Sequence, residues 1–421
     1  MIGVAVGLGN VWRFPYMMGK YGGSAFLIIY LLFTLLFAVP ALMAEIGLGR
    51  ATRKGPVGAF SSAFGEKTGL GIGYLLLLTI CVASSYYVVV IANVLYSAGY
   101  SAIFGFEGGQ NIKNYQKYLD NGWAQYALVL ILILTCLTII QKGLKNGIEA
   151  VSKLFIPLFL IVLIYLIGNA LTLDGAWEKI QLFLKPDFYA LKATHVFAAL
   201  GQAFYSLSLG GTFMLIYGSY LPSEEKIPRI ALLTSFGDVG AAMLASLFIV
   251  PTVLVFNLDM TSGPTLIFST LPHLFSQMAG GQTIGTLFLL ALGLVAILSL
   301  VAGYEVLFSG MNDLPGMNWG PKKKLLLIGI LQTLLAFPNS FNTSLIGWLD
   351  LIFGSGMQVL GSTLAAIGLS WGMGKVITRE QIFPSKNRNL NYLFHFWLSW
   401  IIPGILFLVL ISYIFDTIIT L

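Results

Sequence analysis

Two short stretches combine glycines with polar side chains inside strongly apolar surroundings. The first, residues 3–15, holds three glycines, the amide of Asn10 and the guanidinium of Arg13, and the second, residues 201–211, holds glycines and two serines. Glycine weakens a helix, and an unwound turn at membrane depth survives only where its freed N–H and C=O groups face protein, ligand or water. Freed N–H groups can hold an anion and freed carbonyls a cation. The two stretches therefore predict broken helices that bind a substrate and ions.

The alternative for either stretch is a glycine-rich helix packed closely on a neighbour, which is common in membrane bundles. For an isolated stretch this alternative would be favoured. The second stretch lies five hydrophobic spans after the first, and interrupted segments at corresponding positions in two halves point to a transport site. The pair therefore favours the transport interpretation.

Composition indicates an all-α polytopic membrane protein. Of 421 residues, 57% are hydrophobic and 10% are charged, and the mean hydropathy is +0.87. Apolar runs are long enough to cross about 30 Å of hydrocarbon, whereas a membrane β-barrel would show short alternating segments. Cys81 and Cys136 lie in apolar runs and indicate neither a disulfide framework nor a metal site. The net charge of +6 reflects loop asymmetry rather than nucleic-acid binding.

The hydrophobic runs predict eleven spans, with a partly helical extramembrane loop at 261–280. The spans fall near residues 1–19, 24–49, 70–103, 123–141, 147–169, 192–221, 227–257, 281–311, 324–338, 341–372 and 391–419. Placing the 50–69 loop in the cytoplasm puts most Lys and Arg on that side, so the positive-inside rule predicts an extracellular C-terminus. The abrupt start at the glycine stretch leads us to expect that the first half of span one is missing. No cleavable signal peptide is expected.

Three of the acidic residues within predicted spans carry an expectation from the residues alone. Asp238 is costly in an apolar helix unless it is paired, and is therefore a functional candidate. Glu45 and Glu305 are expected to join helices through buried hydrogen bonds. The chain lacks the repeated polar rings of a channel filter and the nucleophile–base or metal motifs of an enzyme, so we expect neither class.

At these residues the chain resembles the neurotransmitter:sodium symporter family, along essentially its whole length. The motifs that carry the resemblance are 7–15, 22–26, Tyr86-Tyr87, 206–210, and Gly147 spaced from Pro157. The resemblance implies the LeuT fold, a five-plus-five inverted repeat with helices 1 and 6 broken, in the eleven-helix form found in bacterial hydrophobic amino-acid transporters. The first repeat would cover 1–169, an extracellular loop 170–191, the second repeat 192–372, and a loop with the eleventh helix 373–421.

The resemblance also implies two sodium sites and no organic cofactor. The first site would use the Ala5 carbonyl, Asn10, Ser206, Asp238 and the substrate carboxylate. Because Asp238 supplies a fixed negative charge, transport is expected to be chloride-independent. The second site would use the carbonyls of Gly3, Val6 and Val295 with the hydroxyl of Ser299, although Leu298 stands where the family usually has another oxygen ligand.

The substrate carboxylate would meet the N–H groups around Leu8 and Gly9 and the hydroxyl of Tyr87. Its ammonium group would face carbonyls of the two broken helices, at Ala5, Tyr205 and Ser206. The side-chain pocket would comprise Ala83, Tyr205, Ser208, Gly211, Ser299 and Gly303. The small residues at 211 and 303 imply an enlarged apolar pocket for neutral hydrophobic amino acids, including aromatic ones.

The resemblance further names gates and a flexible helix. Arg13 and Asp350 would form the outer ion pair, with Tyr205 as a lid, and Asp313 would be the acidic member of the inner gate. Gly147 and Pro157 would let the fifth helix unwind, although Pro157 is equally well explained as a simple kink.

The implied function is sodium-coupled symport of hydrophobic amino acids by alternating access, in a multi-pass protein of the bacterial plasma membrane. The alternative is a proton-coupled amino-acid transporter of the same fold. The sequence gives no indication of the oligomeric state.

Overall fold

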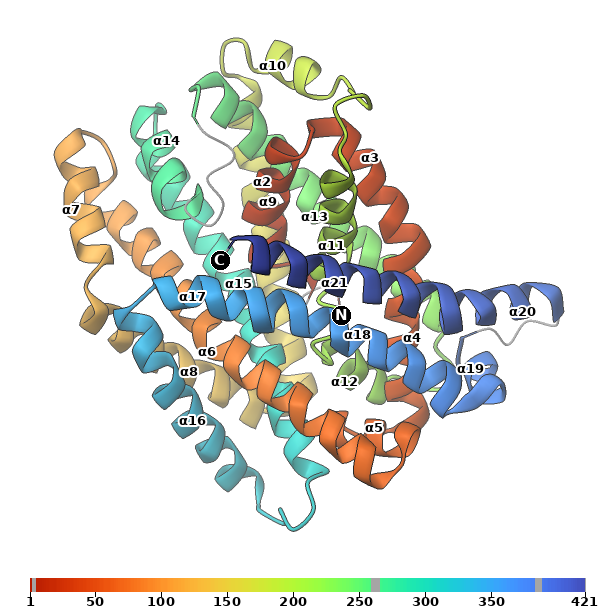
Figure 1. Cartoon of the computed structure of the whole chain (residues 1–421). Helices are drawn as coiled ribbons and strands as arrows, with labels where there is room; N and C mark the ends of the chain where they lie inside the picture. Colours follow the sequence, from red (N-terminus) through yellow and green to blue (C-terminus); the bar gives the residue numbers. More distant parts are fainter. Residues whose placement is uncertain (2–4, 259–265, 383–387, 421) are drawn as a thin grey trace.

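The computed structural model describes residues 1, 5–258, 266–382 and 388–420, and over these residues the chain is helical without β-strands (Figure 1). Several spans carry π-helical turns, at Gly9–Arg13, Thr34–Ala38, Leu144–Glu149, Leu266–Thr270, Asp350–Gly356, Gly368–Gly372 and Trp397–Ile401. The α-helices are α2 (Phe14–Lys20), α3 (Gly23–Phe33), α4 (Val39–Thr52), α5 (Pro56–Phe64), α6 (Glu66–Phe104), α7 (Gly109–Leu119), α8 (Gly122–Gln141), α9 (Ala150–Leu171), α10 (Ala176–Phe183), α11 (Ala193–Ser206), α12 (Phe213–Ser219), α13 (Ile227–Val255), α14 (Leu271–Gln277), α15 (Gly281–Asn312), α16 (Pro321–Phe341), α17 (Ser344–Leu349), α18 (Met357–Ile367), α19 (Gly374–Ile382), α20 (Arg388–Phe396) and α21 (Ile402–Thr420).

Within the described ranges, nine helices are long and apolar enough to cross a membrane. The predicted first and sixth spans are not among these nine, because each is divided into shorter pieces. The predicted loop at 261–280 contains α14, which confirms its partly helical character for the described residues from 266 onward.

The first break precedes the π-helical turn Gly9–Arg13. The helical hydrogen-bond pattern is interrupted at Val6 and Gly7, and the Asn10 side-chain oxygen accepts a hydrogen bond from the Gly7 N–H at 2.8 Å. The Gly7 N–H has no helical partner, and the Asn10 side chain supplies one. Non-helical backbone inside a membrane is stable only when its polar groups are paired in this way.

The second break separates α11 from α12. Ser208, Gly210 and Thr212 all have positive φ, at 53°, 83° and 58°. The Gly210 N–H donates to the buried carboxylate of Glu45 at 2.5 Å. A Cβ at Gly210 would collide with the carbonyl of Gln358 on α18, so glycine is required both for the backbone conformation and for this close approach.

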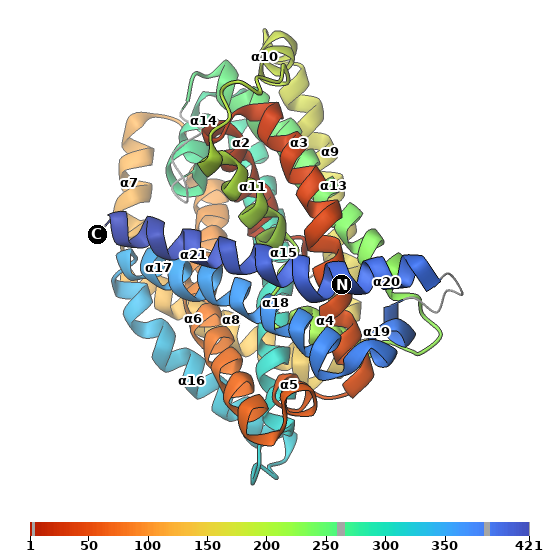
Figure 2. The ribbon, with the colours of Figure 1, turned by 45° about the vertical axis from the view of Figure 1, so that its right-hand side comes forward.

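The broken helices lie inside the bundle, among long helices. Helix α15 packs along α6, α11 packs against α3, and α12 packs against α4 (Figures 1 and 2). The short helices α10 and α14 lie at one end of the bundle, whereas α5 lies at the other, as both views show. The two breaks therefore lie between the ends of the bundle rather than at its surface.

Helices α4 and α12 meet backbone to backbone. A Cβ on Gly49 would collide with the Leu215 carbonyl, and a Cβ on Gly218 would collide with the Ile46 carbonyl. At the same end of α4, the buried Arg50 guanidinium donates to the Gln381 carbonyl at 2.6 Å and to the Glu225 carbonyl at 2.5 Å. These contacts fix α12 against α4 and join α4 to the segment after α12 and to α19.

Candidate functional site

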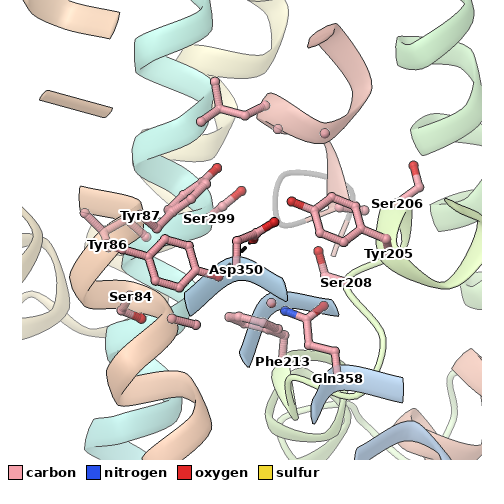
Figure 3. Close-up of a pocket in the computed structure, with 17 residues that line it drawn as sticks. Ser84, Tyr86, Tyr87, Tyr205, Ser206, Ser208, Phe213, Ser299, Asp350 and Gln358 are labelled. Carbon is pink, nitrogen blue, oxygen red and sulfur yellow. Dashed lines mark hydrogen bonds between the residues drawn. The ribbon is translucent and has the colours of Figure 1, made fainter. Parts of the chain in front are cut away.

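A cavity of about 100 Å³ lies where the two breaks meet α6, α15 and α18; we call it the central cavity (Figure 3). At the ~10–15 Å³ that one water molecule requires, it has room for roughly seven to ten waters. Nine of the predicted substrate positions line it, namely Ala5, Leu8, Gly9, Ala83, Tyr87, Tyr205, Ser206, Ser208 and Ser299.

Gly211 and Gly303 are not among the described lining residues. A Cβ added to Gly211 would run into the ring of Phe213, and one added to Gly303 would approach the hydroxyl of Ser84 at 2.7 Å. The space that these glycines leave is therefore already filled by neighbouring side chains. Phe213 and Ser84 themselves line the cavity, together with Gln358, and the sequence had singled out none of the three.

Asn10, Ser206 and Asp238 form one buried cluster. The Asn10 amide donates to the Asp238 carboxylate at 2.6 Å and lies 3.4 Å from the Ser206 hydroxyl, which itself donates to the other carboxylate oxygen at 2.7 Å. All three side chains are at most 3% exposed. The cluster brings together the first break, the end of α11 and the middle of α13, and its three side chains are among those that the sequence predicts for a first sodium site.

The chemistry of this cluster suits a small hard cation. Amide, hydroxyl and carboxylate oxygens are the ligands that such ions prefer, whereas transition metals favour imidazole and thiolate. Among the described residues, no group of three His, Cys, Asp or Glu side chains could hold a metal ion. The site would therefore depend on neutral oxygens around a single carboxylate.

The residues expected for the second sodium site are partly described. Gly3 lies outside the described residues. Val6 and Val295 are buried, and a Cβ on Gly7 would lie 3.0 Å from the Ser299 hydroxyl oxygen, so that Ser299 faces the first break. Leu298 is buried at 2% exposure and contributes no oxygen from its side chain.

Close approaches explain two glycines of the first break. A Cβ on Gly9 would lie 2.9 Å from the Tyr205 ring, and a Cβ on Gly7 would lie 3.6 Å from the Tyr87 hydroxyl. Bare backbone therefore faces both tyrosines across the cavity. Backbone approach of this kind is what a substrate carboxylate needs in order to reach N–H groups.

The outer end of the cavity holds the predicted gate residues. The Arg13 guanidinium lies 3.8 Å from the centre of the Tyr205 ring, a cation–π contact. The hydroxyl of Tyr86 donates to the Asp350 carboxylate at 3.0 Å. The structure thus places Tyr205 beside Arg13 and adds Tyr86, a partner of Asp350 that the sequence reading did not identify.

A second hollow of about 590 Å³, the outer hollow, begins at this gate. It is lined by α7 and by the π-helical turn Leu266–Thr270. It shares five lining residues with the central cavity: Leu8, Tyr86, Tyr87, Tyr205 and Asp350. The central cavity is therefore approached from the end of the bundle that carries α7 and α14.

Hydrogen bonds link neighbouring segments at the opposite end. The Asp313 carboxylate accepts from the Gly58 N–H of α5 at 3.0 Å, and the Tyr220 hydroxyl donates to Glu305 at 2.6 Å. Burial raises the pKa of Asp313, while the Gly58 N–H and the charge of Lys54 act in the opposite direction. The sequence predicts that Glu305 joins helices through a buried hydrogen bond, and the structure identifies Tyr220 as its partner.

The fifth span has the two features on which its predicted flexibility rests. Gly147 lies in the π-helical turn Leu144–Glu149, where a Cβ would collide with the Ile139 carbonyl. Helix α9 continues through Pro157. The span is thus irregular at Gly147 and helical at Pro157.

A membrane-embedded cavity between two broken helices, with buried oxygens at one end, is the arrangement of a secondary transporter. A model of the sodium:neurotransmitter symporter family matches residues 1–106 and 110–419. The chain therefore belongs to the sodium:neurotransmitter symporter family, which consists of transporters rather than enzymes.

Three relatives carry names that agree with this assignment. The uncharacterized sodium-dependent transporter YhdH of Bacillus subtilis is 30% identical over 336 residues, covering 78% of this chain and 74% of the relative. An uncharacterized sodium-dependent transporter of Haemophilus influenzae is 28% identical over 440 residues, covering 98% and 95%. The uncharacterized sodium-dependent transporter MJ1319 of Methanocaldococcus jannaschii is 30% identical over 405 residues, covering 90% and 81%.

The structure is also similar to the crystal structure of MhsT in complex with L-phenylalanine. The TM-score is 0.87 at 28% sequence identity, covering 98% of this chain and 96% of that chain. The predicted all-α LeuT fold is confirmed by this similarity, and the protein is a multi-pass membrane protein.

Proposed function

We propose that the protein is a sodium-coupled symporter of neutral hydrophobic L-amino acids that works by alternating access. The observation that carries the proposal is the buried cluster of Asn10, Ser206 and Asp238 beside a cavity flanked by two helix breaks. A cation bound there would lie next to a substrate carboxylate held by freed N–H groups. Each would then favour the other through their opposite charges.

Sodium would be held at two sites. The first would use the carboxylate and neutral oxygens of the cluster together with the Ala5 carbonyl and the substrate carboxylate. The second would use the carbonyls of Val6 and Val295 and the hydroxyl of Ser299. The carbonyl of Gly3, which lies outside the described residues, would complete it. Because Leu298 supplies no side-chain oxygen, the second site would be the weaker one.

Chloride would not be required. A bound cation adds a positive charge to a zwitterionic substrate in a medium of low dielectric constant, and the carboxylate of Asp238 would balance that charge. Asp238 is wholly buried and its two oxygens are held by Asn10 and Ser206, so the charge is fixed in position.

The substrate would bind in an extended orientation. Its carboxylate would meet the N–H groups near Leu8 and Gly9 and the hydroxyl of Tyr87, and its ammonium group would meet carbonyls of the breaks. Among the described residues that line the central cavity, Asp350 is the only charged one, and Tyr86 already binds it. An acidic substrate side chain would find no positive counter-charge among these residues, and the L-phenylalanine bound to the similar MhsT supports a neutral substrate.

The open hollow at one end and the hydrogen-bonded segments at the other correspond to a state approached from the α7 end. Closure of Tyr205 and Arg13 over the bound substrate would precede separation of Asp313 from α5. Unwinding near Gly147, with Pro157 in the same span, would then admit water towards the second sodium site. By linkage, sodium raises the affinity for substrate by the same factor by which substrate raises the affinity for sodium.

In the cell, we place the protein in the bacterial plasma membrane with the α7 end and the C-terminus outside. The distribution of Lys and Arg over the loops supports this orientation. We propose a division into repeats at 1–169 and 192–372, which the position of the two breaks supports.

The test is equilibrium binding of radiolabelled leucine and tryptophan to purified protein, in chloride-free buffer containing either sodium or potassium. Binding that requires sodium, and competition by phenylalanine, would support the proposal. Binding that is indifferent to sodium but changes with a proton gradient in vesicles would favour proton coupling instead. Strong transport of alanine without competition by leucine or tryptophan would contradict the hydrophobic substrate class.

A further inference from the structure

The ring of Phe213 fills the place that two glycines leave empty. A Cβ on Gly211 would collide with two ring carbons, and a Cβ on Gly303 would lie 3.7 Å from a third. The same Gly211 position is 3.2 Å from the end of Ile80 on α6. Phe213 therefore stands between the second break, α15 and α6, and forms an aromatic wall of the central cavity.

The residue before this wall has a strained backbone. Thr212 is β-branched, yet its φ is 58°, a conformation that is unfavourable for such a residue and persists only where its surroundings impose it. Its buried hydroxyl has no hydrogen-bond partner among the described residues. Helix α12 begins at the next position, Phe213. The turn at Thr212 thus sets the direction in which the Phe213 ring leaves the backbone.

A polar group stands at the same end of the cavity. Figure 3 draws Gln358 and Phe213 together at the lower end of the central cavity, on the opposite side from Tyr87. The backbone of Gln358 is held against Gly210, whereas its amide makes no hydrogen bond with any described residue. The side chain is half-buried and lines the cavity, so its amide is available to a ligand there.

The hydroxyl of Ser84, which lies over Gly303, also lines the cavity. The side-chain end of the pocket is therefore not uniformly apolar. It offers one aromatic face together with an amide and a hydroxyl.

We propose that Phe213 and Gln358 determine side-chain specificity, favouring aromatic amino acids whose ring carries a hydrogen-bonding group. The substrate ring packs on Phe213, and its indole N–H or phenol hydroxyl pairs with the Gln358 amide. This inference rests on the proposed function, because it takes an amino acid as the occupant of the central cavity. Tryptophan and tyrosine then bind more tightly than leucine.

The size of the preference follows from the chemistry of the site. A neutral hydrogen bond made in place of water is worth about threefold to tenfold in affinity. A site that keeps a polar group for its ligand penalises an analogue that lacks the partner, since the amide is then left unpaired. Leucine offers neither a ring for Phe213 nor a partner for Gln358.

The test compares dissociation constants for tryptophan, tyrosine, phenylalanine and leucine in sodium buffer. The variants are Gln358→Leu, Phe213→Leu and, as a matched control, Gln141→Leu at the exposed end of α8. We expect Gln358→Leu to weaken tryptophan and tyrosine threefold to tenfold while leucine changes less than twofold. Phe213→Leu weakens all three aromatic substrates relative to leucine, and the control behaves as the unaltered protein.

Two results would overturn the inference while leaving the proposed function intact. One is an unaltered protein that binds leucine in sodium as tightly as tryptophan. The other is a Gln358→Leu variant, unchanged in thermal unfolding, that keeps the ratio of tyrosine to phenylalanine affinity. If the unaltered protein bound none of the four in a sodium-dependent manner, the proposed function would fail and the inference with it. Because the first comparison needs no variant, it holds even if a substituted protein does not fold.

Discussion

The side-chain amide of Asn10 contacts Asp238 twice, at 2.6 Å to the carboxylate and at 3.0 Å to the backbone carbonyl. The same side chain accepts from the Gly7 N–H at 2.8 Å. One amide therefore joins the broken backbone of the first span to the charge on α13. Anything that changes this charge is transmitted to the N–H groups that face the central cavity.

Replacing that charge is the most direct test of the cation site. We expect Asp238→Asn to lower the sodium affinity at least tenfold in chloride-free buffer, about 1.4 kcal/mol, with partial recovery when chloride is added. The reason is that the neutral amide keeps the size of the side chain but removes its negative charge. The measurement is the sodium dependence of substrate binding with and without chloride.

Ser246→Ala is the control on the same helix, because that hydroxyl bonds only the backbone of its own helix, at Ala242. It should leave the sodium dependence unchanged. An Asp238→Asn protein with the original sodium affinity would show that the cluster does not bind the coupling ion.

The contact between Arg13 and the ring of Tyr205 predicts a difference between two substitutions. Tyr205→Phe keeps the aromatic face and should release substrate at nearly the original rate. Tyr205→Leu loses a contact worth about 0.5–2 kcal/mol, so that release should accelerate roughly threefold to thirtyfold. The rate of tracer release after dilution measures this, and equal rates for the two variants would exclude a lid function of the ring.

At the second break, adding a single methyl group should greatly lower the stability of the fold. Gly210→Ala introduces a Cβ at a φ of 83° and forces it against the Gln358 carbonyl, so we expect a loss of about 2 kcal/mol or more. Gly240→Ala on α13 is the matched control, since nothing lies within 4 Å of its added Cβ. Thermal unfolding in detergent should show a lower midpoint for the first variant and an equal or higher one for the second. Similar midpoints would mean that the break can relax around Gly210.

Asp313 predicts a dependence of stability on pH. Burial raises its pKa, so the folded protein holds this proton more tightly than the unfolded chain does. The stabilisation is complete below the ordinary Asp pKa of about 4, and is lost as the pH rises through the raised pKa. Thermal unfolding between pH 4 and 7 should therefore show a smaller loss of stability with rising pH for Asp313→Asn than for the unaltered protein. Parallel curves would assign the pH dependence to other groups.

Much of the fold could be predicted because membrane spans are recorded locally in the sequence. Long apolar runs are stable only inside a membrane or a protein core. Unwound glycine-rich backbone and a buried aspartate are stable there only where other groups bind them. The partners of these groups were harder to predict. Glu45 meets Gly210 from 165 positions away, and neither residue indicates the other.

The side-chain end of the cavity shows why the enlarged pocket implied by the resemblance was not found there. Small residues at 211 and 303 imply open space only if no neighbour enters it. Phe213 enters it because the positive φ at Thr212 redirects the chain, and that conformation of a threonine has no sequence signal. Gln358 comes from α18, whose approach to Gly210 depends on the tertiary packing as a whole.

The backbone contact between α4 and α12 has a mechanical consequence. Two helices that touch through Gly49 and Gly218 cannot slide past each other without separating, so they turn as one lever. Within the second span, the turn Thr34–Ala38 is π-helical and is followed closely by Pro40, where the helix lacks a backbone donor. We therefore expect this pair of helices to pivot at the turn Thr34–Ala38. Movement of the second break would then reach the Glu225 and Gln381 carbonyls through Arg50, without any need for α4 itself to bend.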